Sequence, residues 1–236
     1  MKDIKMKKIQ TILVSDFQQN ARVLWDEETK ECVVFDPGDL GIKITSFLND
    51  NDLILSSLVL THSHIDHIMG VNKVLDYSNR SSEFKYYGHE NEKMMREMLP
   101  QISDLYGFSP LLEAIPEPTH YISGDETIEL IGMTAEVRFV PGHSPGHLVF
   151  FISDYLGTID SPFSKMSSVN GPVVIAGDTL FKGSIGRTDL PGSNHNDLMN
   201  ALQTQLLTLP DETRVLSGHG PDTTIGIERK TNPFLR

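Results

Sequence analysis

The chain contains the segment Thr61-His62-Ser63-His64-Ile65-Asp66-His67, in which three histidines and an aspartate fall within six residues. Crowded imidazoles repel one another when they are protonated, unless a bound cation holds them neutral. Neutral imidazole nitrogens and a carboxylate suit Zn²⁺, Fe²⁺ or Mn²⁺. Alternation along the loop would let His62 and His64 face one ion while Asp66 and His67 face another. The segment therefore predicts a metal site with two ions rather than a histidine-rich surface loop.

Three later motifs supply further donors, and each one follows an apolar run in the order strand, glycine, donor. The motifs are Pro141-Gly142-His143-Ser144-Pro145-Gly146-His147, Gly177-Asp178-Thr179 and Ser217-Gly218-His219-Gly220. Packing in a loop would explain any single one of these donors. Together with the first cluster, His143, Asp178 and His219 complete a metal site. We expect His147 to pack beside the site and not to bind metal.

The regular elements are predicted from hydrophobic periodicity and turn residues. Strands are expected over residues 9–14, 21–25, 32–35, 53–60, 84–87, 148–152, 172–176 and 214–216, with a hairpin over 128–140. Helices are expected over residues 42–49, 91–99 and 196–209, and the methionines at 94, 95 and 98 should face the core. Residues 156–171 are rich in Ser, Gly and Asp and predict a long hairpin loop. This order favours helices packed outside a pair of sheets.

Composition narrows the class of protein. The 236 residues suit one domain spanning 1–236, and we expect a monomer or homodimer. A formal charge of -12 argues against nucleic acid or an anionic membrane as partner. No apolar run approaches the roughly 20 residues of a membrane helix, and residues 1–8 are not followed by a signal-peptide core. The single cysteine, Cys32, lies in an apolar run and predicts a buried thiol in a cytoplasmic protein.

The motifs THSHIDH, PGHSPGH, GDTLF and SGHG together resemble the metallo-β-lactamase superfamily, in the order expected for that family and over nearly the whole chain. The resemblance implies an αββα sandwich, with two mixed β-sheets flanked by helices and the site at one edge between the sheets. It implies that one metal is held by His62, His64 and His143. It also implies that the second metal is held by Asp66, His67 and His219, with Asp178 bridging both. An aspartate at the bridging position, with no ligating cysteine, fits the hydrolase branches better than the lactamases proper.

Within the superfamily the chain is similar to the short bacterial proteins that resemble glyoxalase II, the hydroxyacylglutathione hydrolases. The segments behind this narrower resemblance are Gly183-Ser184-Ile185-Gly186-Arg187-Thr188-Asp189, Glu228-Arg229-Lys230-Thr231-Asn232-Pro233-Phe234, Tyr87-Gly88-His89-Glu90 and Asp104-Leu105-Tyr106-Gly107-Phe108. Seventeen residues follow His219, so we expect no C-terminal helical domain that binds glutathione. Gly220-Pro221 replaces an acidic residue and a tyrosine, and Asp189 falls where a tyrosine is usual. These departures leave the thiol portion of the substrate open.

The resemblance implies a metal-dependent hydrolase that cleaves a thioester, such as S-D-lactoylglutathione, or a related ester. A hydroxide held between two ions beside Asp178 would attack the carbonyl, and Asp66 would help to orient it. Arg187 matches a basic position that contacts substrate, where it could pair with a carboxylate. Zinc is the metal we expect, and iron or manganese also suits these donors. Asp36, in the turn Asp36-Pro37-Gly38, is expected to anchor the chain beside the site.

Three other functions stay open at this point. An iron-dependent persulfide dioxygenase would use one Fe²⁺ held by His62, His143 and Asp178, and oxygen uptake with a metal count separates it from a hydrolase. A lactonase would use the same hydroxide on a cyclic ester. A non-catalytic, metal-dependent binding module would show a tight ligand with little hydrolysis, and fold resemblance does not decide among these.

Overall fold

The structure is a computed structural model, which describes residues 6–108 and 112–236. The strands of the N-terminal half are β1 (Lys7–Val14), β2 (Gln19–Asp26), β3 (Glu31–Phe35), β4 (Ile54–Val59), β5 (Arg80–Gly88) and β6 (His120–Tyr121). Those of the C-terminal half are β7 (Thr127–Leu130), β8 (Met133–Phe139), β9 (Leu148–Ser161), β10 (Ser164–Gly177), β13 (Arg214–Ser217) and β14 (Thr223–Thr224). A separate short hairpin consists of β11 (Leu180–Phe181) and β12 (Ser184–Ile185).

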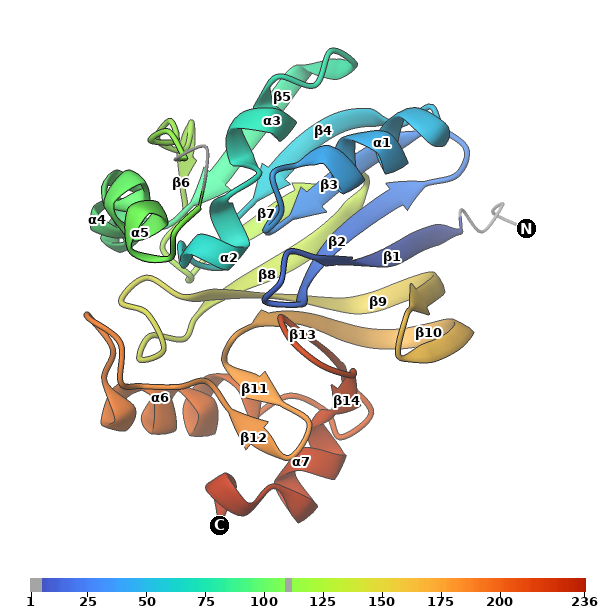
Figure 1. Ribbon diagram of the computed structural model, residues 1–236. Coiled ribbons are helices and arrows are strands. Elements are labelled where there is room, and N and C mark those ends of the chain that lie inside the picture. Colours follow the sequence, from blue (N-terminus) through green and yellow to red (C-terminus); the bar gives the residue numbers. More distant parts are fainter. Residues whose placement is uncertain (1–5, 109–111) are drawn as a thin grey trace.

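Helices cover the two outer faces of these strands (Figure 1). The first half carries α1 (Ile42–Asp50), α2 (Ile65–Ile68), α3 (Val71–Leu75), η1 (Glu90–Glu92), α4 (Lys93–Glu97) and α5 (Leu99–Leu105). The second half carries α6 (His195–Ala201), the π-helical turn η2 (Leu202–Leu206), α7 (Ile225–Thr231) and η3 (Pro233–Leu235). In Figure 1, α1 and α3 lie above the N-terminal strands, and α6 and α7 lie below the C-terminal ones.

The long strand β9 connects the two halves. Its first residues pair antiparallel with β8, and its residues Gly157–Asp160 pair parallel with Lys7–Gln10 of β1. Twelve strands of the described chain therefore form one hydrogen-bonded network, whose main path runs β14-β13-β10-β9-β1-β2-β3-β4-β5-β6. The network folds over, so that its two halves pack against each other as the two sheets of a sandwich.

Alternation along each strand separates three layers of apolar side chains. In β3, Val33 and Phe35 face the core between the two halves, whereas Cys32 and Val34 face the core under α1. In β10, Ile175 faces the inner core and Val174 faces the core under α6. The order is therefore helices, sheet, sheet, helices, which confirms the predicted αββα fold. Cys32 is fully buried as expected, and burial raises the pKa of its thiol to about 12.

The prediction of a long loop over residues 156–171 was wrong. The strands β9 and β10 continue through this region as a hairpin, with only Pro162 and Phe163 between them. Tyr155 and Ile159 are fully buried in the inner core, and the polar side chains lie mostly on the other face. A strand with one apolar face needs apolar residues only at alternate positions, so a polar average composition concealed it.

The expected helices differ in detail. In place of one helix over 91–99 the chain forms η1, α4 and α5, and α5 begins with Pro100 in its first turn. Met95 is buried as predicted, but Met94 and Met98 are exposed, which corrects that part of the core. Residues 196–209 form α6 and η2 before Pro210, and α7 was not predicted.

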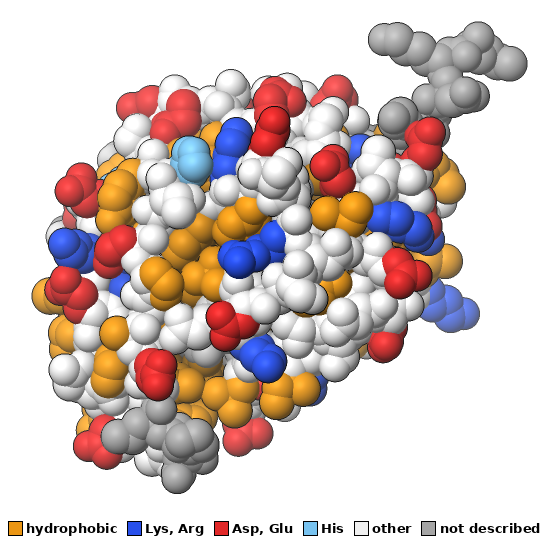
Figure 2. Space-filling view, turned by 90° about the horizontal axis from the view of Figure 1, so that it is seen from above, with side chains coloured by type: hydrophobic (Ala, Val, Ile, Leu, Met, Phe, Trp, Pro, Cys, Tyr) orange, Lys and Arg blue, Asp and Glu red, His pale blue; other side chains and the backbone are white. Residues whose placement is uncertain are grey.

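The outer face seen from above carries acidic, basic and apolar side chains intermingled, without a broad cationic area (Figure 2). Within residues 6–108 and 112–236, no helix has the length and apolar character needed to cross a membrane.

Candidate metal centre

All of the predicted donors meet at one edge of the sandwich, where several strands end. They follow the C-terminal ends of β4 (His62, His64 and, in α2, Asp66 and His67), β8 (His143), β10 (Asp178) and β13 (His219). Loops at the ends of strands are a common location for ligand sites because the sheet holds them rigidly.

The first group of donors consists of His62, His64 and His143, and all three side chains are buried. One ring nitrogen from each lies within 4.8 Å of the others. Nδ1 of His64 is 2.9 Å from Nε2 of His143, and the rings of His62 and His64 meet edge to face at 4.7 Å. Three nitrogens converging in this way fit one divalent ion.

The second group consists of Asp66, His67 and His219, whose donor atoms also lie within 4.8 Å of one another. Oδ2 of Asp66 is 3.0 Å from Nε2 of His219 and 3.9 Å from Nε2 of His67. One carboxylate and two imidazoles are again a donor set for a divalent transition metal.

Asp178 lies between the two groups. Its Oδ1 is 3.3 Å from Nε2 of His67, and its Oδ2 is 3.5 Å from Nε2 of His219. The same Oδ2 is 3.7 Å from Nε2 of His143, in the first group. A single carboxylate is therefore within reach of both donor groups, as a bridging ligand requires.

Hydrogen bonds on the outer side of the rings select the tautomers that metal binding needs. Asp36 Oδ2 accepts from Nδ1 of His67 at 3.0 Å and from the Thr61 hydroxyl at 2.7 Å. Because the Thr61 hydroxyl donates its hydrogen bond to Asp36, its oxygen accepts from Nδ1 of His62 at 3.0 Å. The Arg187 carbonyl accepts from Nδ1 of His143 at 2.8 Å. Each arrangement places the proton on Nδ1 and leaves a lone pair on Nε2, facing inward.

Several buried polar atoms at the centre have no hydrogen-bond partner in the described chain. They are Nε2 of His62 and of His67, and Oδ1 of Asp178. Buried polar groups are normally paired, and each exception calls for an explanation. A pair of cations coordinated by these atoms supplies one, so the residues present fit a two-metal site.

The pKa values of the buried histidines also fit a site that binds cations. Burial, reinforced by neighbouring histidines, lowers the pKa of His62 well below its usual range and that of His64 to about 3. Burial also lowers the pKa of His67, but the carboxylates of Asp178 and Asp66 outweigh it and raise that pKa well above its usual range. Without metal, a proton on His67 therefore balances the buried carboxylates. A bound cation would replace that proton.

Two residues beside the donors hold them in place. Asp36 anchors the turn as expected, because its Oδ1 accepts the Thr61 backbone N–H at 2.7 Å. Its carboxylate also lies within 4.8 Å of donor atoms of His62 and His67, but it faces Nδ1 of His67, the atom turned away from Asp178. Nε2 of His147 accepts the backbone N–H of Asp178 at 3.0 Å, which agrees with a place beside the donor set.

The side chain of Arg187, expected to contact substrate, is paired with Asp189 in the structure. Its side chain lies at the surface, where Nε and Nη2 donate to the two carboxylate oxygens of Asp189 at 2.7 and 2.9 Å. Its backbone carbonyl orients His143, a contact that the sequence reasoning missed because backbone groups leave no mark in a motif. Contact between the Arg187 side chain and substrate stays a prediction.

The glycine at position 218 in the SGHG motif is explained by its closeness to the donors. A Cβ at this position would lie 2.1 Å from Oδ1 of Asp178 and 2.9 Å from Cε1 of His67. The backbone before His219 must therefore pass directly against the donors, which only glycine permits.

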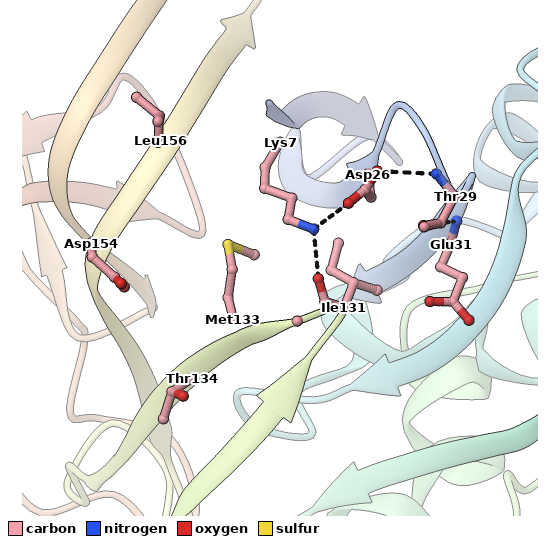
Figure 3. Close-up of a pocket in the computed structure, with 10 residues that line it drawn as sticks. Lys7, Asp26, Thr29, Glu31, Ile131, Met133, Thr134, Asp154 and Leu156 are labelled. Atoms are coloured by element: carbon pink, nitrogen blue, oxygen red, sulfur yellow. Dashed lines mark hydrogen bonds and ion pairs between the residues drawn. The ribbon is translucent and has the colours of Figure 1, made fainter. Parts of the chain in front are cut away.

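A cavity of about 410 Å³ lies elsewhere, near the start of β1 (Figure 3). There Nζ of Lys7 donates to Oδ2 of Asp26 at 2.5 Å and to the Ile131 carbonyl at 2.6 Å. The buried lysine is thus already paired, and none of the predicted donors lines this cavity.

Several known proteins are similar to this chain in sequence. The model of the Metallo-beta-lactamase superfamily matches residues 14–155 and 165–219. The chain is 36% identical over 225 residues to the probable metallo-hydrolase YqgX of Bacillus subtilis, and the match covers 94% of each chain. It is 33% identical over 227 residues to the hydroxyacylglutathione hydrolase GloC of Haemophilus influenzae, covering 96% of this chain and 97% of the relative.

Solved structures show the same architecture. The BLEG-1 B3 metallo-beta-lactamase superposes with a TM-score of 0.76 at 33% identity, covering 96% of this chain and 99% of the other. TTHA1623, solved in a di-iron-bound form, superposes with a TM-score of 0.74 at 32% identity, covering 95% and 99%. The fold, the two donor groups and these likenesses agree, and the chain belongs to the metallo-β-lactamase superfamily as a metal-dependent hydrolase.

Proposed function

We propose that this protein is a two-metal hydrolase that cleaves a thioester, an S-acylglutathione such as S-D-lactoylglutathione, or a related ester. The observation that carries the proposal is the meeting of two donor groups at Asp178. His62, His64 and His143 would hold one ion, Asp66, His67 and His219 would hold the other, and Asp178 would bridge them. GloC, a hydroxyacylglutathione hydrolase by name, supports the choice of substrate because it matches over almost its whole length.

Two divalent ions at this site would lower the pKa of a shared water toward neutrality and polarise a carbonyl oxygen. The residues of the chain supply orientation. Asp66 would orient the attacking oxygen, while Asp36 and the Arg187 carbonyl accept from Nδ1 of His67 and of His143 and so leave Nε2 of each ring to bind metal. A thiolate is a weakly basic leaving group, so its departure would need no strong general acid from the protein.

Arg187 is proposed to contact a carboxylate of the substrate. Its guanidinium is paired with Asp189 on one side only, through Nε and Nη2. A guanidinium carries five N–H donors, so donors outside that pair would be free to face substrate. We expect Arg187→Ala to raise KM for anionic thioesters more than it lowers kcat, because the contact is remote from the reacting carbonyl.

The first experiment measures hydrolysis by protein loaded separately with zinc, iron and manganese. The substrates are S-D-lactoylglutathione, a thioester without glutathione, a lactone and a β-lactam, and a parallel assay follows oxygen uptake with glutathione persulfide. We expect metal-dependent thioester hydrolysis to exceed the other reactions. Oxygen consumption with one iron per chain would favour the dioxygenase instead, and preferred cleavage of the lactone or the β-lactam would replace the thioester.

The second experiment tests the bridging carboxylate. Asp178→Asn keeps the shape of the side chain but removes the charge between the two donor groups. We expect loss of hydrolysis by at least about 10²-fold, because both the shared water and the second ion depend on that charge. An Asp178→Asn protein with unchanged metal content and the wild-type rate would contradict the proposal.

A further inference from the structure

A buried glutamate behind the first donor group has no part in the proposed chemistry. Glu92 lies at the end of η1, is 1% exposed, and faces two of the donor loops. Its Oε2 accepts the backbone N–H of Ser63 at 2.8 Å, and its Oε1 accepts the backbone N–H of Gly146 at 2.6 Å. Burying a carboxylate is expensive unless it is fully hydrogen-bonded, so the arrangement points to a specific purpose.

The positions of the two N–H groups indicate that purpose. Ser63 lies between His62 and His64, and Gly146 lies in the loop that carries His143. One carboxylate therefore ties together the two loops that supply all three imidazoles of the first donor group. These loops are 83 residues apart at the tied positions, the first after β4 and the second between β8 and β9.

Two further contacts show that the fit around Glu92 is close. A Cβ on Gly146 would lie 2.7 Å from Cγ of Glu92, so this glycine of the PGHSPGH motif admits the side chain. Arg96, fully buried one helical turn later, donates from Nη1 to Oγ of Ser63 at 3.3 Å and from Nη2 to Glu117 at 2.6 Å. The Ser63 backbone is thus held by Glu92 and its side chain by Arg96.

We propose that Glu92 is a positioning residue for the first metal, because its carboxylate sets the separation between the His62–His64 loop and the His143 loop. The inference rests on the two-metal site proposed above, and it deepens that proposal by naming a residue that supports one ion and not the other. Glu92 touches neither Asp66, His67 nor His219 among the contacts of the described chain, so its loss should weaken only one of the two ions.

The test uses the full chain, stripped of metal and titrated with Co²⁺, whose visible absorption reports the ligands around each ion. In Glu92→Gln the amide has one oxygen, so it satisfies one backbone N–H and turns its NH₂ group toward the other. We expect one cobalt equivalent to bind about 10–100-fold more weakly, with a changed absorption band, because residues that support ligands have effects of this size. The other equivalent should keep its affinity within about threefold.

Glu228→Gln is the matched control. Glu228 is also a fully buried glutamate that accepts from a backbone N–H, that of Gly183 at 2.8 Å, and from the Thr223 hydroxyl at 2.6 Å. We expect this variant to lower Tm about as much as Glu92→Gln does, while both cobalt equivalents bind as in the wild type. A second test variant, Gly146→Ala, crowds Glu92 from the opposite side and should reproduce the selective loss, so it tests the inference even if Glu92→Gln does not fold.

Each outcome decides the inference. Selective weakening of one equivalent in Glu92→Gln or Gly146→Ala, but not in Glu228→Gln, supports it. Unchanged binding, equal weakening of both equivalents, or the same selective loss in Glu228→Gln overturns it. Because the readout is cobalt binding, a protein that binds two cobalt ions but hydrolyses no thioester would defeat the proposed function and leave this test intact. A wild-type chain that binds no cobalt would overturn both.

Discussion

Asp36→Asn is a sharp test of how the rings of the site are oriented, because it replaces one carboxylate oxygen at the centre of a series of hydrogen bonds by an NH₂ group. Asp36 Oδ2 accepts from the Thr61 hydroxyl and from Nδ1 of His67, and the Thr61 oxygen faces Nδ1 of His62. An asparagine would keep one oxygen for the Thr61 backbone N–H and turn its NH₂ group toward the hydroxyl and His67. That NH₂ group would reverse the direction of these hydrogen bonds and favour a proton on Nε2 of His62 and of His67.

The expected magnitude follows from the position of those atoms. Nε2 of His67 is 3.3 Å from Asp178 and Nε2 of His62 faces the first donor group, so a proton on either atom opposes metal binding. We expect each ion to bind about 10–100-fold more weakly, which corresponds to about 1.4–2.7 kcal/mol per ion. Unlike Glu92→Gln, this variant should affect both equivalents.

The assay is a competition titration of metal-free protein against a chromophoric chelator, with nitrogen NMR of the histidines to report their tautomers. Asp39→Asn, three residues further along the chain, is the control and should match the wild type. If Asp36→Asn binds two metal equivalents with wild-type affinity and keeps Nδ1 of His67 protonated, Asp36 does not orient these rings.

Three further predictions concern stability and geometry. Without metal, Tm should peak near pH 6.5, the usual pKa of histidine. The pKa of His67 is raised in the folded protein, so stability should fall as the pH rises above 6.5. The pKa of His62 is lowered, so stability should also fall as the pH drops below 6.5. Melts in chelator across the pH range check this, and a monotonic rise to pH 9 would contradict it. Gly218→Ala should lose metal, measured by elemental analysis, because its methyl would meet Asp178 Oδ1; full metal content would show that the loop can yield. Leu216→Ala, in the core between the sheets, should lower the free energy of unfolding in urea by about 2–5 kcal/mol, and a loss below about 1 kcal/mol would argue against a tightly packed core.

The donors could be found from the sequence because each motif carries its own local signal. In the Gly177-Asp178 and Gly218-His219 pairs, a glycine after an apolar strand marks a chain that turns sharply at the sheet edge. The structure brings these residues to the His62–His67 segment, so strand ends predicted separately converge at one edge.

Other features depend on tertiary contacts that no short pattern records. Glu92 lies in a segment rich in charged residues, so the sequence indicates a solvent-exposed side chain. In the structure the loops that carry Ser63 and Gly146 cover it. The carbonyl of Arg187 has no sequence signature at all. Residues 156–171 form strands because β1 and the inner core lie beside them, and their polar outer face obscured the alternation.

The two-metal site can be observed by anomalous diffraction from crystals of the zinc-loaded protein. We expect two zinc peaks, one among His62, His64 and His143 and the other among Asp66, His67 and His219, with Asp178 in contact with both. A single peak at full occupancy, or an ion bound through Asp36 with Asp178 left uncoordinated, would contradict it.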